Sequence, residues 1–192
     1  KRGEILENSL HFNNGKFKIM QITDTQEIHC VNPDTVKLIS LALDREKPDL
    51  VVFTGDQIKG YSATFKGNTR QKITETLSEI FRPVIERKIP FTATFGNHDR
   101  DCGIGNNVQA EIYKSFPGFV SGAPRHPDDA GTFLLELKDS NNEKSIFALY
   151  LIDSNAKDKK AKAYSPVFKD QVEWYKKERD RLNAENGALL PA

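Results

Sequence analysis

Side chains that can bind a metal or move a proton follow three apolar runs of this 192-residue chain. They lie in residues 22–26 (Ile-Thr-Asp-Thr-Gln), in Gly55-Asp56 and in residues 96–99 (Gly-Asn-His-Asp). Each apolar run is typical of a β-strand, and the ligands of an open parallel sheet bind beyond the carboxyl ends of its strands. The order therefore predicts that the three segments meet at one edge of one sheet.

The predicted site combines the carboxylates of Asp24 and Asp56 with the amide of Asn97 and the imidazole of His98. Oxygen ligands together with an imidazole nitrogen suit divalent first-row metals such as Mn, Fe and Zn. Two such ions about 3.5–4 Å apart can hold the attacking and leaving oxygens of a phosphoryl transfer. The residue types therefore predict a two-metal hydrolase. Asp56, which follows the turn-forming Gly55, is the candidate that bridges both ions.

Three segments of the first half of the chain are predicted to be β-strands, namely residues 17–23, 50–53 and 91–95. Residues 50–53 are continuously apolar, which favours a strand buried on both faces of a parallel sheet. The strands therefore provide both the core and the edge at which the polar segments follow.

Helical patterns separate these strands. A helix is predicted to begin at Asn32-Pro33, with Asn as N-cap and Pro at the first helical position, and to end at Pro48. Residues 73–81 predict a second helix, which can continue past Pro83 with a kink. Alternating strands and helices form right-handed crossovers, so we predict an α/β fold.

The second half of the chain predicts a β-hairpin and two further helices. Residues 133–137 and 146–152 are the strand-like runs of the hairpin, and residues 110–115 form a short helix before it. The last helix is expected to begin with Ser165 as N-cap and Pro166 at the first helical position.

Charge and apolar runs narrow the function classes. Lys and Arg together number 28 against 27 for Asp and Glu, and this net charge of +1 gives no case for nucleic acid, acidic substrates or membrane surfaces. The longest apolar run, residues 146–152, is too short to span a bilayer. The chain begins at Lys1 without a signal-like segment, so we expect a trimmed chain. Removal of an export signal is one explanation of this start, and the sequence determines neither the compartment nor the oligomeric state.

The two cysteines and one lysine-rich segment of the chain give no sign of a role in binding or catalysis. The 2 cysteines, Cys30 and Cys102, favour free thiols, with a single bridge as the alternative. The lysine-rich residues 157–162 favour a solvated loop over a phosphate-binding one, because no glycine-rich or aromatic segment accompanies them.

The order of the three polar motifs resembles the calcineurin-like metallophosphoesterase superfamily. Its pattern is Asp-x-His, Gly-Asp, Gly-Asn-His-Asp or Gly-Asn-His-Glu, then a later His and Gly-His-x-His. Residues 21–24, 51–56 and 149–154 are most similar to the purple-acid-phosphatase-like phosphohydrolase branch. The resemblance covers residues 16–192 after a polar segment, 1–15, and implies two packed mixed β-sheets flanked by helices.

This resemblance implies a role for each site residue. Asp24 would bind the first metal, Asp56 would bridge both and Asn97 would bind the second. His98 would lie beside the phosphate, and Asp99 would either orient His98 or serve the structure alone. The nucleophile would be a metal-bound hydroxide and the substrate a small-molecule phosphate ester, whose identity the loops of residues 59–69 and 100–131 would determine.

The first motif departs from the family pattern, because Gln26 stands where the pattern has His. A carbonyl oxygen coordinates more weakly and prefers harder metals, which favours Mn over Fe or Zn. His29 is an alternative ligand or an exposed loop histidine. Lys59 occupies the place of the purple acid phosphatase tyrosine, and Tyr61 is out of step for that role, so a purple iron site is not expected.

The later histidines of the pattern are also absent. The chain has 4 histidines and no Gly-His-x-His, and His126 is a ligand candidate only if its irregular loop reaches the site. The chain is therefore expected to be the first two-thirds of a catalytic domain, truncated at its C-terminus.

Two functions remain as hypotheses. The first is a metal-dependent phosphoesterase, and the second is a calcineurin-like fold that lost catalysis and serves as a binding or scaffold module. An unrelated nucleotide-binding α/β domain is disfavoured, because no Gly-x-Gly-x-x-Gly follows the first strand.

Overall fold

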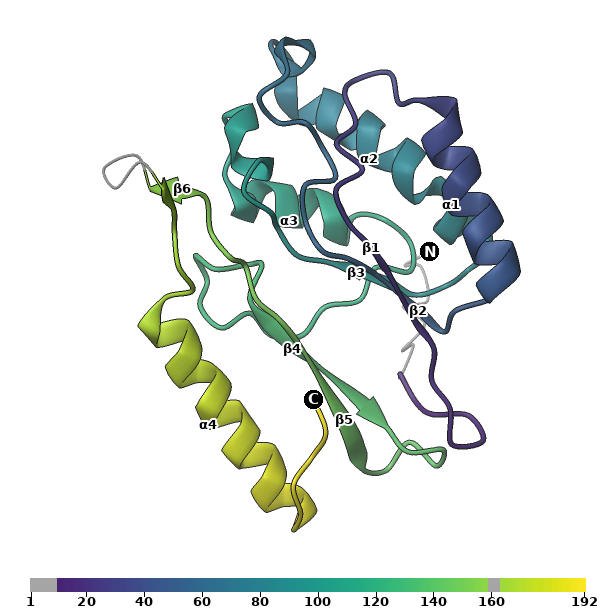
Figure 1. Ribbon diagram of the computed structural model, residues 1–192, viewed down its shortest axis with the longest axis vertical. Helices are drawn as coiled ribbons and strands as arrows, with labels where there is room; N and C mark the ends of the chain where they lie inside the picture. The colour runs from purple at the N-terminus through teal and green to yellow at the C-terminus, as the bar shows by residue number, and fades with distance from the viewer. Residues whose placement is uncertain (1–9, 159–162) are drawn as a thin grey trace, which may run out of the picture.

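Two β-sheets lie between helices in the computed structural model, which describes residues 10–158 and 163–192 (Figure 1). Helices α1 (Pro33–Glu46) and α2 (Thr69–Glu86) cover one side of a parallel sheet. A β-hairpin packs on the opposite face of that sheet, and helix α4 (Lys169–Asn186) lies outside the hairpin. The predicted α/β fold with packed sheets and flanking helices is thus confirmed.

The parallel sheet has the order β1 (Ile19–Ile22), β2 (Leu50–Phe53) and β3 (Phe91–Ala93). Every residue of the central strand β2 is buried, as the apolar run predicted. Val51 and Phe53 belong to the core shared with α1 and α2, whereas alternate residues of β2 belong to the core shared with the hairpin. One strand therefore joins the two cores of the domain.

Helix boundaries in the first half follow the local sequence. The Asn32 side chain accepts a hydrogen bond from the backbone N–H of Asp34 at 3.0 Å, and Pro33 is the first helical residue of α1. Lys47 ends α1 in a left-handed conformation, with its N–H bonded to the Leu43 carbonyl at 2.9 Å. Helix α2 continues through Pro83, as expected.

The second sheet is the predicted hairpin of β4 (Phe133–Lys138) and β5 (Ser145–Leu151), paired antiparallel. Alternate residues of β4 point toward β2, and α4 packs on the other face. The Tyr150 ring lies edge-to-face against Trp174 of α4, and Arg181 bonds to Glu136 at 2.9 Å. Polar and aromatic contacts together attach α4 to the hairpin.

The start of α4 differs from the prediction, because it begins at Lys169 rather than at Pro166. The Gln171 side chain accepts a hydrogen bond from the backbone N–H of Phe168 at 2.9 Å. Its amide nitrogen also donates to the Asp153 carbonyl at 2.9 Å. A cap held by another part of the fold thus outweighs the local Ser-Pro signal.

Shorter elements lie in the connecting segments. Helix α3 (Asn106–Lys114) begins earlier than predicted, directly after Gly105. The 3-10 helix η1 (Ala63–Phe65) lies within the first loop predicted to rim the site, residues 59–69. The 3-10 helix η2 (Asp99–Cys102) begins one residue before the second, residues 100–131. Strands β6 (Lys157–Asp158) and β7 (Ala163–Tyr164) pair, whereas residues 159–162 of the lysine-rich segment lie outside the described residues.

The described part of the N-terminal segment packs against the hairpin. The backbone N–H of Phe12 bonds to the Lys138 carbonyl at 2.9 Å, and the Lys138 N–H bonds to the Leu10 carbonyl at 2.7 Å. Cys30 and Cys102 are free thiols, as expected. Across the described residues, we find no helix with the length and apolar character needed to cross a membrane.

Helix α1 offers a matched test of the core. Leu43 is 1% exposed and Leu41, on the same helix, is 58% exposed. We expect Leu43→Ala to lower the free energy of unfolding by about 2–5 kcal/mol, because it removes buried methyl groups and leaves a cavity. Leu41→Ala should change it by no more than about 0.5 kcal/mol. Urea unfolding monitored by circular dichroism measures both, and equal losses would contradict the packing described.

Candidate functional site

The loops that follow β1, β2 and β3 meet at the carboxyl edge of the parallel sheet. The backbone N–H of Asp24 bonds to the Gly55 carbonyl at 3.1 Å, and that of Gln26 bonds to the Asp56 carbonyl at 3.0 Å. The backbone N–H of His98 bonds to the Asp56 carboxylate at 2.7 Å. The structure therefore brings together the segments that the sequence placed at one sheet edge.

The backbone of this edge is strained. Asp24, Gln26 and Asp56 have φ angles of 51°, 48° and 54°, in the left-handed region that L-residues rarely adopt. Asp tolerates this region better than Gln, since its short side chain can bond locally. Strain of this kind persists only where neighbouring contacts enforce it, and it clusters at functional sites.

Two glycines let the second and third loops touch through their backbones. A Cβ at Gly55 would lie 2.3 Å from the Gly96 nitrogen, and a Cβ at Gly96 would lie 2.3 Å from Oδ1 of Asp56. No larger residue fits either position without displacing the other loop. The two glycines therefore leave the space in which Asp56 lies between the loops.

Asp99 is a buried carboxylate that joins the same two loops. Its Oδ2 accepts hydrogen bonds from the backbone N–H groups of Asp56 at 2.9 Å and Gly96 at 2.7 Å. Burial raises the pKa of Asp99 to about 7, although these bonds oppose the change. The contacts of Asp99 are therefore those of a residue that positions the loop backbones.

The imidazole of His98 contacts Asp101, so the contacts of Asp99 match the structural one of its two predicted roles. Nδ1 of His98 lies 2.8 Å from Oδ2 of Asp101, whereas Asp99 points inward. The short helix η2 explains the contact with Asp101, because its turn brings the residue three positions after His98 beside the ring. The orienting contact thus belongs to Asp101, which the i,i+3 spacing from His98 could have revealed.

A second loop borders His98. The Tyr61 ring meets the His98 ring edge-to-face, with 4.8 Å between centroids, and the Lys59 ammonium lies 5.4 Å from the Tyr61 centroid. A Cβ at Gly60 would lie 2.1 Å from the His98 carbonyl oxygen. Tyr61, out of step with the tyrosine of the resembling branch, is therefore part of the wall beside His98.

Two of the predicted metal ligands, Asp56 and Asn97, are polar groups in an unfavourable buried environment. Burial raises the pKa of Asp56 despite the His98 N–H, and the nearby Asp24 carboxylate adds to the effect. The amide nitrogen of Asn97 is buried without a hydrogen-bond partner among the described residues. The Gln26 amide nitrogen donates to Oδ2 of Asp56 at 3.1 Å. Amide oxygen and nitrogen are assigned by context, so both amides can present oxygen instead.

This donor set fits an oxygen-liganded divalent cation, which would offset the charge of two neighbouring carboxylates. In the part of the chain that the structure describes, no three His, Cys, Asp or Glu side chains gather as a metal-binding group. An ion at this edge would therefore need amide oxygens in addition to the carboxylates of Asp24 and Asp56.

Neither alternative histidine joins the site. Nε2 of His29 lies 2.8 Å from Glu75 of α2. His126 is exposed, and its Nδ1 lies 3.7 Å from Asp128. Contacts with nearby residues account for both histidines, and Nδ1 of His126 accepts the backbone N–H of Asp128 at 3.1 Å. The interpretation of His29 as a loop residue is the one that matches its contacts.

Residues 17–187 match the family described as calcineurin-like phosphoesterase. The chain belongs to this family. The match covers both sheets, the three polar loops and helix α4, so the resemblance seen in the motifs is confirmed. Calcineurin-like phosphoesterases generally use divalent metals.

Several curated proteins are similar to this calcineurin-like chain. Two from Arabidopsis thaliana, named "Probable inactive purple acid phosphatase 29" and "Probable inactive purple acid phosphatase 14", are 27% and 28% identical over 91% and 86% of this chain. "Phosphatase DCR2" of Saccharomyces cerevisiae is 32% identical over 73% of it. The matches cover 50%, 47% and 27% of these relatives, so the chain spans about half of their length or less.

The backbone contact between the loops can be tested with one methyl group. We expect Gly96→Ala to destabilise the fold by about 1–3 kcal/mol, because the added Cβ would overlap the Asp56 carboxylate. Gly105→Ala is the matched control, since its Cβ would meet nothing within 4 Å. Urea unfolding measures stability, and calorimetric titration with Mn²⁺ measures binding. Equal behaviour of the two variants in both measurements would contradict the close approach of the loops.

Proposed function

We propose that this chain carries a metal-dependent phosphoesterase site that acts on a small-molecule phosphate ester. The observation that supports it most is the meeting of Asp24, Asp56 and Asn97 at one sheet edge, within a calcineurin-like domain. The strained backbone and the glycine contact serve no purpose in a simple turn, but they suit a site that must hold oxygen ligands in fixed positions.

Two divalent ions are the proposed cofactors. Asp24 and Gln26 would hold the first, Asn97 the second, and Asp56 both. Bound there, the ions would neutralise charge on the phosphate and lower the pKa of water. Oxygen donors at every one of these positions favour Mn over Fe or Zn.

His98 is the proposed catalytic side chain. Because Nδ1 contacts Asp101, Nε2 is the ring nitrogen left for a phosphate oxygen or a leaving group. The Asp101 carboxylate favours the tautomer with its proton on Nδ1, and protonation of the ring would then make Nε2 a donor as well. Asp99 contributes by holding the loop that carries this ring rather than by contact with substrate.

A binding or scaffold module without catalysis is the second candidate. The Gln26 amide faces Asp56 through its nitrogen, which occupies an oxygen that a metal would need. The names of two relatives also contain the word "inactive". These observations favour the second candidate only if the site fails to bind metal.

Replacement of His98 separates the two functions. We expect His98→Ala to lower the Mn²⁺-dependent turnover of an aryl phosphate ester by about 10²–10⁴-fold, as loss of a proton-transferring group does. His126→Ala is the control, because this exposed histidine lies outside the site. The assay is run on the 192-residue chain and on a form extended to the length of its relatives, with metal content measured on each.

Three results would change the interpretation. Turnover by His98→Ala at the wild-type rate would remove its assigned role. Metal binding without turnover in either wild-type form would refute the enzyme. Absence of both metal and turnover would leave the binding module as the function.

A further inference from the structure

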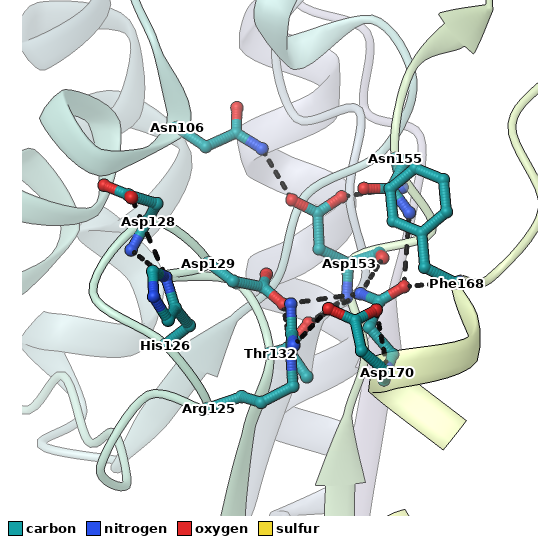
Figure 2. A network of polar contacts seen from close by, with 12 residues as sticks. Asn106, Arg125, His126, Asp128, Asp129, Thr132, Asp153, Asn155, Phe168 and Asp170 are labelled. Atoms are coloured by element: carbon teal, nitrogen blue, oxygen red, sulfur yellow. Dashed lines mark hydrogen bonds and ion pairs between the residues drawn. The ribbon is translucent and has the colours of Figure 1, made fainter. Parts of the chain in front are cut away.

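A buried carboxylate outside the proposed metal ligands lies just after strand β5. The Asp153 side chain is 1% exposed, and its Oδ2 accepts hydrogen bonds from Arg100 at 2.8 Å and from the Asn106 amide at 2.7 Å. Figure 2 shows Asn106 directed at this carboxylate.

The carboxylate is fixed from the side of the second sheet. Its Oδ1 accepts from the backbone N–H of Asn155 at 2.8 Å, and its own N–H donates to the Thr132 hydroxyl at 3.1 Å. Gln171 of α4 donates to the Asp153 carbonyl at 2.9 Å. Contacts from Thr132, from Asn155 and from helix α4, none of them in the proposed metal site, therefore fix the position of this negative charge.

Arg100 connects that charge to the loop of the candidate site. It is two residues after His98 and lies within η2, the short helix that His98 precedes. Among the described residues, Arg100 is the cation within ion-pair distance of Asp153. A buried charge is costly unless it is paired, so Asp153 draws the guanidinium inward and Arg100 cannot leave without a penalty.

We propose that Asp153 is a positioning residue, which acts through Arg100 to fix the loop that carries Asn97 and His98. The second sheet and α4 thereby determine the position of groups that stand on the first sheet. The expected effect of Asp153 on turnover rests on the proposed phosphoesterase function, whereas its expected effect on the position of the loop does not.

The test compares Asp153→Asn, Arg100→Gln and the double variant with a control on the same polar network. Asp170→Asn removes an exposed carboxylate that bonds to Arg125 at 2.8 Å and does not contact Arg100. Amide hydrogen exchange across residues 96–102, measured without substrate, reports on the loop alone. Turnover and KM for an aryl phosphate ester with Mn²⁺ report on catalysis in the extended form.

We expect Asp153→Asn to raise exchange in residues 96–102 about tenfold more than in α4, since local opening depends on local contacts. We expect kcat to fall about ten- to a hundredfold with little change in KM, as misplacement of a catalytic group does. The double variant should be no worse than the more impaired single variant, because both remove one interaction. Asp170→Asn should leave both readouts within about twofold of wild type.

Additive losses in the double variant, or exchange that rises equally in α4 and in residues 96–102, would overturn the proposal. If Asp153→Asn does not fold, Arg100→Lys gives the same test. Lysine keeps the charge but lacks the planar fork of donors, so exchange of the same segment should still rise. A wild-type protein without turnover would refute the phosphoesterase, and the exchange result would still decide whether Asp153 positions the loop.

Discussion

One buried carboxylate holds the candidate site together. Asp99 accepts hydrogen bonds from the backbones of two loops that follow different strands, at Asp56 and at Gly96. Its other oxygen has no hydrogen-bond partner among the described residues, and the backbone of Ile58, together with those two bonds, opposes the rise that burial causes in its pKa. The strained conformation of Asp56 depends on this arrangement, since a free loop would relax to an ordinary turn.

The layers of the fold make that arrangement possible. Strand β2 is buried on both faces, with helices on one side and the hairpin on the other, so its end cannot shift along the sheet. The loop that follows β2 therefore begins from a backbone whose position is fixed by packing on both faces. A site built on rigid strands can hold its ligands closely even though every ligand stands on a loop.

The candidate site keeps some residues of the family motifs and departs from others. Asp24, Asp56 and Asn97 retain oxygen donors at the positions of the family motifs, and His98 is backed by a carboxylate. Gln26 stands where the family pattern has His, and its amide bonds to the Asp56 carboxylate at 3.1 Å. The fold alone does not determine function, so these side chains are where the proposed phosphoesterase and the proposed binding module would differ.

The sequence by itself determined the alternation of strands and helices, the hairpin, the buried character of β2 and the meeting of the three motifs. Each depends on local periodicity, on capping residues or on the rule that parallel strands end at one edge. Only the tertiary structure decided that Asp101 rather than Asp99 contacts the His98 ring, and that His29 and His126 pair elsewhere. The tertiary structure also decided that α4 begins at Lys169 rather than at Pro166, and that Asp153 pairs with Arg100. The contact of His29 with Glu75, the start of α4 and the pairing of Asp153 with Arg100 depend on side chains that face one another across elements distant in sequence, which no local pattern encodes. The contact of His98 with Asp101 depends instead on the turn of η2, which brings a residue three positions away beside the ring.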